Sequence, residues 1–214
     1  MGRTLITDFD GTITERDFYS LLWERYIPGD APDYFGEYRA GRLSHFDAMA
    51  GYFAYAPADS SEMDAVLRDC RPDPELGAAF ERLRRAGWEV VVVSAGSQWY
   101  IERVLRGAGV SACVYANPGR LVEGRGLVIE RLPRESPYYS EDVGVDKSAV
   151  VRAALAGGGE VAFAGDGPPD VGPAMLVRAE RRFARGHLAE ALRERGEGFV
   201  GFSRWSEIAG ELAG

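Results

Sequence analysis

Residues 4–12 read TLITDFDGT, and this stretch decides the fold. Its first four residues favour a β-strand, and the Asp-Gly step that follows is typical of a turn at a strand end. In an extended chain residues i and i+2 face the same way, so Asp8 and Asp10 present two carboxylates to one place. Two like charges this close are costly unless a cation or a shared proton offsets them. The stretch therefore predicts either a plain turn or a site that needs both acids.

Strand and helix patterns alternate along most of the chain. The Val-rich run at 88–93 is of the kind that is buried in a parallel sheet. Further strands are expected at 3–8, 112–115, 161–164, 181–184 and 199–202, helices at 74–86, 97–107, 146–156, 170–178, 187–195 and 204–213, and a hairpin at 120–131 that turns at 123–126. This alternation predicts an α/β fold with a doubly wound parallel sheet, which is Rossmann-like.

The segment between the first and second expected strands follows a different pattern. It predicts three or four short helices, with breaks at Pro28 and Pro57, and it is dense in aromatic residues. Most of these aromatic side chains are expected to pack within the helical segment itself. We therefore expect a Rossmann-like core of residues 1–14 and 73–214 with a helical cap of residues 15–72 inserted into it.

Composition and charge limit the classes of function. The chain has 214 residues, 46% of them hydrophobic, and can bury a substantial core. A net charge of −8 argues against a surface for nucleic acid or for an anionic membrane. The N-terminus lacks the pattern of a signal peptide and no apolar run is long enough to span a bilayer, so we expect a cytoplasmic protein, monomeric or homodimeric. Cys70 and Cys113 lack metal-site spacing and are expected to be free thiols.

Polar groups gather where α/β sheets bind ligands, at the carboxyl ends of strands and at one helix start. These groups are Asp8 with Asp10, Ser94-Ala95-Gly96, the GDGPPD run at 165–170, and Lys147. Each also has a plain structural explanation, since Ser94 and Asp170 could cap helices and Gly-Pro pairs make turns. Lys147 is the only lysine among 25 basic residues, which indicates either a need for a compact charge or a bias in composition. Because all of these groups are expected at one edge of the sheet, the pattern favours a functional site there.

In order and spacing these motifs resemble the haloacid dehalogenase superfamily of phosphohydrolases, over nearly the whole chain. The motif at 8–12 is the most specific of them. The helices between the first and second motifs resemble the small cap of the phosphoserine-phosphatase-like branch, as do Ala116-Asn117 and the hairpin after them. The stretches 183–185 and 202–208 resemble instead the methylthiopentenyl-phosphate phosphatase family of methionine salvage, although that family's cysteine-rich insert is missing.

The resemblance implies a Mg²⁺-dependent phosphomonoester hydrolase that forms an aspartyl-phosphate and acts on a small phosphorylated metabolite. Asp8 would be the nucleophile, Asp10 the general acid and base, and Lys147 a third catalytic residue. The metal would be held by Asp8, the main-chain carbonyl of Asp10 and Asp166, with Asp170 binding it either directly or through water. The phosphoryl group would be bound by Ser94, Ala95, Gly96, Lys147, Gly11 and Thr12.

Two departures from the phosphoserine-phosphatase pattern leave the substrate open. Pro169 stands where that branch usually carries an Asn, and residues 49–53 lack the arginine that binds the serine carboxylate there. Asp17 matches the acid that the branch uses for the amine, so we expect Asp17 to contribute to substrate specificity. Phosphoserine phosphatase and a phosphotransferase of the same superfamily are the alternatives. Both histidines are expected to be peripheral: His187 at the surface, and His45 either on a surface helix of the cap or in a position from which it could approach a substrate.

A non-enzymatic receiver domain is the rival from another class, because it also joins acids, a Ser or Thr and a Lys on a doubly wound sheet. Such a domain is much shorter, has no helical insertion and carries its phosphorylated Asp on a middle strand. No Asp follows the strand at 88–93 here. A halide-releasing enzyme, in turn, has no use for Asp10, because halide leaves without a proton. The sequence therefore favours a phosphatase.

Overall fold

Six parallel strands form the central sheet in the order β10-β9-β8-β1-β2-β3. The structure is a computed structural model and describes residues 2–214. The strands of this sheet are β1 (Arg3–Thr7), β2 (Trp88–Ser97), β3 (Cys113–Asn117), β8 (Glu160–Gly165), β9 (Arg182–Ala184) and β10 (Val200–Gly201). The helices around it are α5 (Leu76–Arg85), α6 (Gln98–Gly107), α7 (Lys147–Ala156), α8 (Val171–Ala174), α9 (Gly186–Glu194) and α10 (Trp205–Ala213). The predicted doubly wound α/β fold is confirmed.

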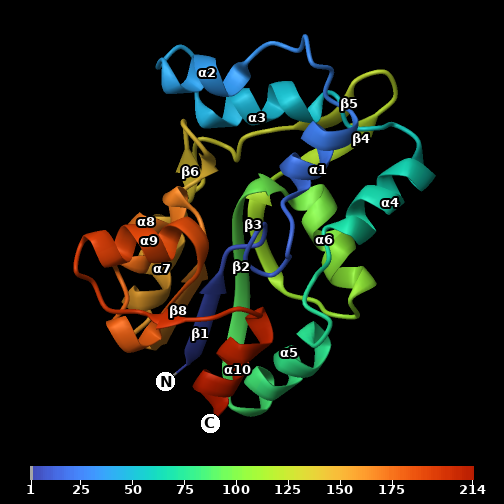
Figure 1. The fold of residues 1–214 in the computed structure, drawn as a ribbon. Coiled ribbons are helices and arrows are strands. Elements are labelled where there is room, and N and C mark those ends of the chain that lie inside the picture. The colour runs from blue at the N-terminus through green and yellow to red at the C-terminus, as the bar shows by residue number, and fades with distance from the viewer. Residues whose placement is uncertain (1) are drawn as a thin grey trace.

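The two faces of the sheet are both buried, as the Val-rich run predicts. Leu5 and Val92 point into one hydrophobic cluster, which α5, α6 and α10 help to form. Their neighbours Ile6 and Val93 point into a second cluster, beneath α7, α8 and α9. Successive strand residues face opposite ways, so a strand buried on both faces needs an unbroken apolar sequence. Figure 1 shows the two groups of helices on either side of the strands.

Two elements differ from the sequence expectation. The helix expected at 170–178 is reduced to the single turn α8, which a 3₁₀ turn at Pro168–Asp170 precedes. Prolines have no N–H to donate, and the three prolines between 168 and 173 prevent a regular helix there. Strand β2 runs four residues beyond the expected end, because an irregularity between Val93 and Ser97 lets the strand pair again with β3.

The segment after β1 contains four helices, as expected. They are α1 (Phe18–Arg25), α2 (Tyr34–Arg39), α3 (His45–Phe53) and α4 (Ser60–Asp69). Figure 1 shows α2 and α3 at the end of the molecule toward which β1 points, with both termini at the opposite end. Helix α4 lies instead against α6 of the core. The division between core and cap at residues 14/15 and 72/73 stays a prediction.

A hairpin from the core supports α3. Its strands are β4 (Gly119–Val122) and β5 (Gly126–Ile129), and β5 packs against α3. Two short strands, β6 (Tyr139–Ser140) and β7 (Gly144–Val145), follow the hairpin. The guanidinium of Arg131 lies 4.1 Å from the centre of the Phe46 ring and donates to Asp47 and Ser44. The Phe46 N–H donates to the carbonyl of Asp142 at 2.7 Å. The start of α3 is therefore fixed to the segment between β5 and β7.

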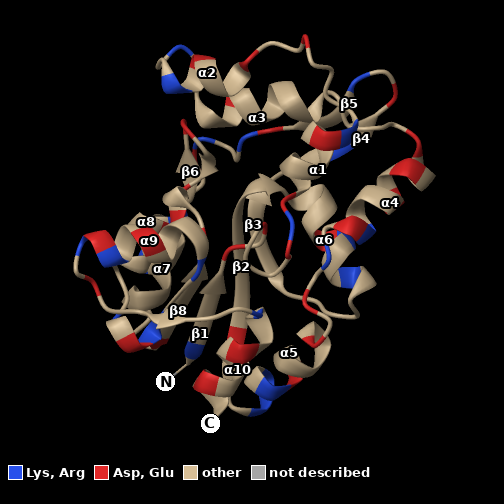
Figure 2. Ribbon diagram, viewed as in Figure 1, with Lys and Arg blue, Asp and Glu red and all other residues tan. Residues whose placement is uncertain are grey.

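The surface helices carry charges of both signs, and the two cysteines are free. In Figure 2, red and blue segments alternate on α4, α5 and α6, whereas α3 is almost wholly tan. Cys70 is buried and Cys113 exposed, and both are free, as expected. Within residues 2–214 no helix is long and apolar enough to cross a membrane.

We predict that Gly126→Ala destabilises the protein more than Gly124→Ala does. Both glycines have φ near +70°, at +66° and +69°, so each alanine costs about 1–2 kcal/mol of backbone strain. A Cβ on Gly126 would also lie 2.7 Å from the Phe53 carbonyl oxygen at the end of α3, whereas Gly124 faces open space. The melting temperatures of the two variants measure the difference. Equal losses would show that the hairpin does not depend on its contact with α3.

Candidate active site

A buried ammonium group joins two carboxylates at the carboxyl end of the sheet. Asp8 follows β1 directly, and Lys147 is the first residue of α7. Lys147 Nζ lies 2.7 Å from Asp8 Oδ1 and 2.6 Å from Asp170 Oδ1. Burial lowers the pKa of Lys147, but the charges of Asp170 and Asp8 outweigh it and hold the pKa above its usual value. The lysine is therefore charged throughout the neutral range.

Both carboxylate oxygens of Asp170 accept hydrogen bonds, Oδ1 from Lys147 and Oδ2 from the main chain. Its second oxygen, Oδ2, accepts the N–H groups of Asp166 at 3.1 Å and Gly167 at 3.0 Å. A Cβ on Gly165 would lie 2.6 Å from Asp170 Cγ, so a side chain at 165 would displace this carboxylate. The GDGPPD run thus folds back to place Asp170 beneath Lys147.

Three carboxylates form a cluster of hard oxygen ligands. One oxygen each from Asp8, Asp166 and Asp170 lies within 4.8 Å of the other two. The Thr12 hydroxyl donates to Asp166 Oδ1 at 2.8 Å and fixes its orientation. Burial, and then the charge of Asp170, raise the pKa of Asp8 well above its usual value and that of Asp166 to about 6. Such crowding of like charges fits a divalent cation, which takes oxygen ligands and offsets their repulsion.

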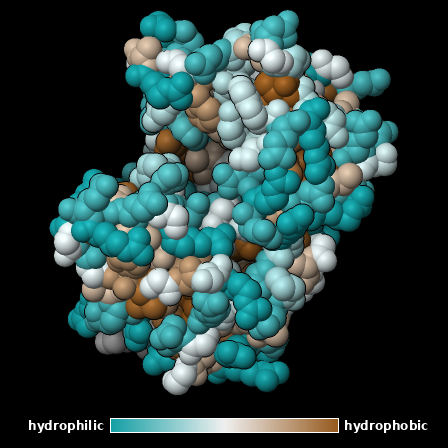
Figure 3. Space-filling model, in the orientation of Figure 1, coloured by the Kyte–Doolittle hydropathy of each residue, from teal (hydrophilic) through white to brown (hydrophobic). Residues whose placement is uncertain are grey.

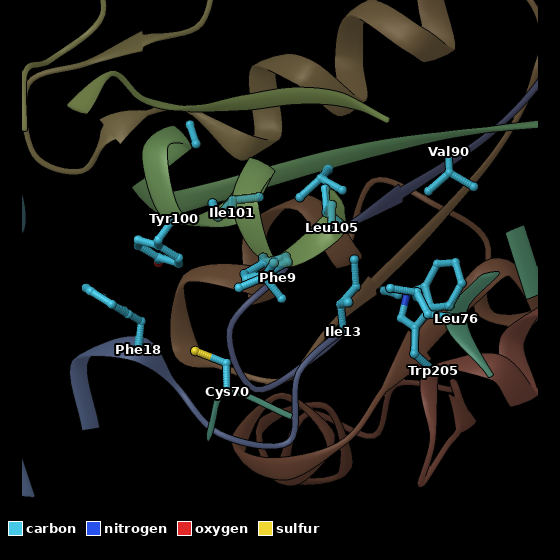
Figure 4. Packing of buried hydrophobic residues seen from close by; sticks show 14 of the residues in the cluster. Phe9, Ile13, Phe18, Cys70, Leu76, Val90, Tyr100, Ile101, Leu105 and Trp205 are labelled. Carbon is cyan, nitrogen blue, oxygen red and sulfur yellow. The ribbon is translucent and has the colours of Figure 1, made fainter. Parts of the chain in front are cut away.

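Asp10 has a separate set of partners. Its Oδ1 accepts the N–H of Phe18 at 2.9 Å, and its Oδ2 accepts the hydroxyl of Tyr100. The Tyr100 and Phe18 rings stack, 4.3 Å apart, and Figure 4 shows Tyr100 between Phe18 and Phe9. Burial, with a contribution from the charge of Asp17, raises the pKa of Asp10 to about 7. A carboxyl with this pKa can both give and take a proton at neutral pH.

The expected phosphate-binding residues divide into two groups. Ser94, Ala95 and Gly96 line the same cavity as Asp8 and Lys147. The structure does not bring Gly11 and Thr12 into that lining, and the prediction that these two residues bind phosphate stays a prediction. The Thr12 hydroxyl is engaged with Asp166, and its N–H donates to the Phe9 carbonyl at 3.2 Å. Gly11 has φ +69°, and a Cβ there would lie 2.9 Å from Asp17 Oδ1.

Unpaired main-chain donors offer a different phosphate contact. Within residues 2–214 the N–H groups of Phe9 and Asp10 have no hydrogen-bond partner. They follow Asp8 directly, at the end of the strand, where successive N–H groups can form an anion-binding concavity. The sequence motif points to this loop but does not say which of its N–H groups are free.

The cavity has a volume of about 220 Å³. Its core side carries Asp8, Asp10, Ser94 and Lys147, and the helical insertion supplies Asp17, Tyr19, Phe35, His45 and Met49. Figure 3 shows a hollow with brown atoms at its base, between the α2–α3 end and the α8–α9 side of the molecule. A larger hollow of about 650 Å³ lies by α5 and β3 and contains none of the candidate residues.

Of the two positions that the sequence leaves open for His45, the structure supports the one from which it could approach a ligand. His45 is the first residue of α3 and lines the cavity. The main-chain N–H of His45 donates to Asp142 Oδ1 at 3.0 Å. This contact between the start of α3 and the core segment places the imidazole on the cavity side. His187, by contrast, is exposed on α9 as expected and pairs with Glu190.

Comparison with known proteins identifies the family. The model of the haloacid dehalogenase-like hydrolases matches residues 5–175. The chain belongs to this family. The hydrolase is 23% identical to 2-hydroxy-3-keto-5-methylthiopentenyl-1-phosphate phosphatase of Exiguobacterium sibiricum, over 97% of this chain and 95% of that protein. It is 24% identical to the enzyme of that name from Microcystis aeruginosa, over 97% and 96% of the two chains.

Solved structures share the fold of this hydrolase. A phosphoserine phosphatase with an analogue of its phospho-aspartyl intermediate aligns over 97% of both chains, with a TM-score of 0.66 and 15% identity. The inserted helices and the parallel sheet thus occur together in proteins of very different sequence.

Two further residues of the hydrolase site escaped sequence reasoning. Tyr100 lies on the apolar face of α6, where its spacing is that of a core residue. Arg185 reaches from β9 to the loop after β1 and donates to the carbonyls of Gly11 at 2.6 Å and Thr14 at 2.7 Å. Both act over more than 80 residues of sequence separation. From the sequence, neither side chain has an assigned role: Arg185 belongs only to the stretch 183–185 that resembles the methylthiopentenyl-phosphate phosphatases, and Tyr100 only to an expected helix.

We predict that the metal-free hydrolase becomes more stable as the pH falls from 8 to 6.5. The folded pKa of Asp10, about 7, lies above the usual 3.8, so the folded state takes up a proton that the unfolded chain does not. The gain is on the order of 1 kcal/mol, measured by urea unfolding in chelator. The lowered pKa of His45 acts in the opposite direction, because the unfolded chain takes up a proton there as the pH approaches the usual value of 6.5, and it offsets part of this gain at the lower end of the window.

Asp10→Asn is the matched control for this pH dependence, because its amide does not titrate. Its stability should still rise through Asp8 and Asp166, whose pKa values are also raised, but by less than that of the wild type. An equal gain in the variant would contradict the assignment of the proton to Asp10.

Proposed function

We propose that this hydrolase cleaves small phosphate monoesters, with Asp8 as the nucleophile and Asp10 as the general acid and base. Hydrolysis is the chemistry of its family, and its curated relatives are named as phosphatases. The observation that carries the proposal is the placement of Asp8 in the cavity, ion-paired to Lys147 and facing a second acid with its own hydrogen-bond donors. A phosphomonoesterase needs this pair, because an alkoxide leaves only when it is protonated.

The reaction follows from the positions of these groups. The Asp8 carboxylate attacks phosphorus, the bond to the ester oxygen breaks, and Asp10 gives its proton to that oxygen. Asp10 then takes a proton from water, which attacks the same phosphorus and releases free Asp8 and phosphate. Lys147 and the Ser94 hydroxyl would bind the phosphoryl oxygens, together with the free N–H groups of Phe9 and Asp10.

The carboxylate cluster supports a Mg²⁺ site. Asp8, Asp166 and the carbonyl of Asp10 would hold the ion directly. Both oxygens of Asp170 already have partners, so we assign it the orientation of Lys147 and of metal-bound water. Bound Mg²⁺ would neutralise charge on the transferring phosphoryl group.

The cavity lining favours an uncharged or cationic leaving group. At about 220 Å³ the cavity is smaller than pockets for drug-sized ligands, which begin near 300 Å³. Among residues 2–214 that line it, Lys147 is the only Lys or Arg, and it is paired with two acids. The carboxylate of phosphoserine would meet Asp17 and aromatic rings there. We therefore propose a small phosphomonoester with an apolar, hydroxylated or cationic body, and a specificity role for Asp17.

We predict hydrolysis of p-nitrophenyl phosphate at near-neutral pH in the presence of Mg²⁺. Chelator should abolish phosphate release, and added Mg²⁺ should restore it. Asp166→Asn should need a higher Mg²⁺ concentration for half-maximal rate, because it removes one charged ligand. Activity that is unaffected by chelator would contradict the metal site.

A substrate panel tests the leaving-group preference. The kcat/KM for phosphoserine should lie below the values for phosphocholine and sugar-type phosphates. A value for phosphoserine well above all the others would instead support a phosphoserine phosphatase.

We predict that Asp10→Asn lowers kcat about 10²–10⁴-fold on alkyl phosphates, which require a protonated leaving oxygen. The loss should be much smaller on p-nitrophenyl phosphate, because nitrophenolate leaves without a proton. Steady-state rates on both substrates give the two ratios. Equal losses on good and poor leaving groups would remove Asp10 from the role of acid.

Lys147→Arg is expected to be nearly as damaging as Lys147→Ala. The ammonium is buried between two carboxylates at 2.7 and 2.6 Å, and a wide planar guanidinium does not fit that space. The kcat/KM for p-nitrophenyl phosphate measures both variants, with Arg152→Lys on the exposed side of α7 as the control. An arginine variant that keeps most of the activity would show that any cation suffices.

A further inference from the structure

The imidazole of His45, in the cavity, has a hydrogen-bonding capacity that no residue in the described part of the chain uses. His45 Nδ1 is buried and has no hydrogen-bond partner within residues 2–214. The other ring nitrogen, Nε2, also makes no hydrogen bond to these residues, but it is not among the fully buried atoms. His45 lines the cavity that holds Asp8 and Lys147, so Nε2 is the nitrogen that a ligand there can reach.

The aromatic neighbours of His45 hold its ring in place. Tyr38 packs edge-on against the imidazole at 5.5 Å between ring centres, and Phe35 lies tilted against it at 5.9 Å. Ser44 caps α3 by accepting the N–H of Asp47. A ring held on two sides, on a capped helix, loses little further entropy when it binds a ligand.

The ring is neutral, and its proton has one favourable position. Burial and the nearby charge of Lys147 lower the pKa of His45 below its usual value. A proton on Nδ1 would be a buried donor without an acceptor, which is rarer and costlier than an unpaired acceptor. The proton therefore belongs on Nε2, which makes Nε2–H a donor directed at the cavity.

We propose that His45 determines substrate specificity by donating Nε2–H to an uncharged oxygen, a hydroxyl or keto group, on the leaving group of the phosphomonoester. The inference rests on the phosphatase function proposed above and names the chemical group of the substrate that the enzyme would recognise. A neutral donor, with Asp17 in the same cavity and no free cation among the described residues that line it, suits such an oxygen better than a carboxylate. The apolar rings of Tyr19 and Phe35 would cover the remaining carbon atoms.

The test compares probes of the same carbon number with and without oxygens. Dihydroxyacetone phosphate and glycerol 1-phosphate carry hydroxyl or keto groups, and n-propyl phosphate carries none. His45→Phe should lower kcat/KM for the two oxygen-bearing probes about tenfold, the worth of one hydrogen bond, mainly through KM. The value for n-propyl phosphate should stay within about twofold of the wild type or rise.

Two isosteric variants locate the nitrogen. The amide of His45→Gln reaches the Nε2 position and should retain more of the selectivity than His45→Asn, whose amide lies near Nδ1. His187→Phe, at the exposed histidine on α9, is the matched control and should leave every ratio unchanged.

The contrary outcomes are distinct. Equal losses of His45→Phe on all three probes would make His45 a packing residue, and no loss on any would mean that it does not touch the substrate. If His45→Asn rather than His45→Gln retained the preference for oxygen-bearing probes, Nε2 would not be the nitrogen that donates to the substrate. A wild-type protein that hydrolyses none of the probes or p-nitrophenyl phosphate would overturn the phosphatase function itself.

Discussion

The ammonium group of Lys147, between Asp8 and Asp170, is the interaction on which the site depends. A cation at the first position of a helix opposes the helix dipole, so α7 alone would not favour a lysine there. Two buried carboxylates at 2.7 and 2.6 Å, and the N-cap bond from the Ala149 N–H to Asp146, offset that cost. Without Lys147 the two acids would repel each other in a buried place. The ion pair thus fixes β1, α7 and the loop after β8 against one another.

The doubly wound sheet delivers these groups to one edge because all six strands are parallel. β1 lies between β2 and β8, so the loops that follow the three strands are neighbours although they are far apart in sequence. In the proposed reaction, the core would supply the reacting acids and the phosphate contacts, and the helical insertion would supply the side of the cavity that faces the leaving group. Asp10 joins the two parts, since its oxygens accept from Phe18, at the start of α1, and from Tyr100 on α6.

From the sequence, the type of reaction could be predicted better than the residues that line the cavity. The strand ends that carry Asp8 and Asp166 could be located because apolar β-branched runs and Asp-Gly turns are local signals. His45 and Tyr100 could not, because their roles depend on contacts between elements: Asp142 fixes the start of α3, and α6 turns Tyr100 toward Asp10. The length of α8 was overestimated because apolar spacing outweighed the prolines in the prediction. The direction in which a side chain points toward another element has no local signature in the sequence.

The account's central claim is that Asp8 is the nucleophile, and trapping the covalent intermediate tests it most directly. The protein is quenched in acid during turnover of p-nitrophenyl phosphate with Mg²⁺, digested and analysed by mass spectrometry. We expect one phosphoryl group on the peptide that contains Asp8, released by hydroxylamine as an acyl phosphate is, and absent from Asp8→Asn. A phosphoryl group on a serine or histidine peptide, or full turnover by Asp8→Asn, would contradict the account.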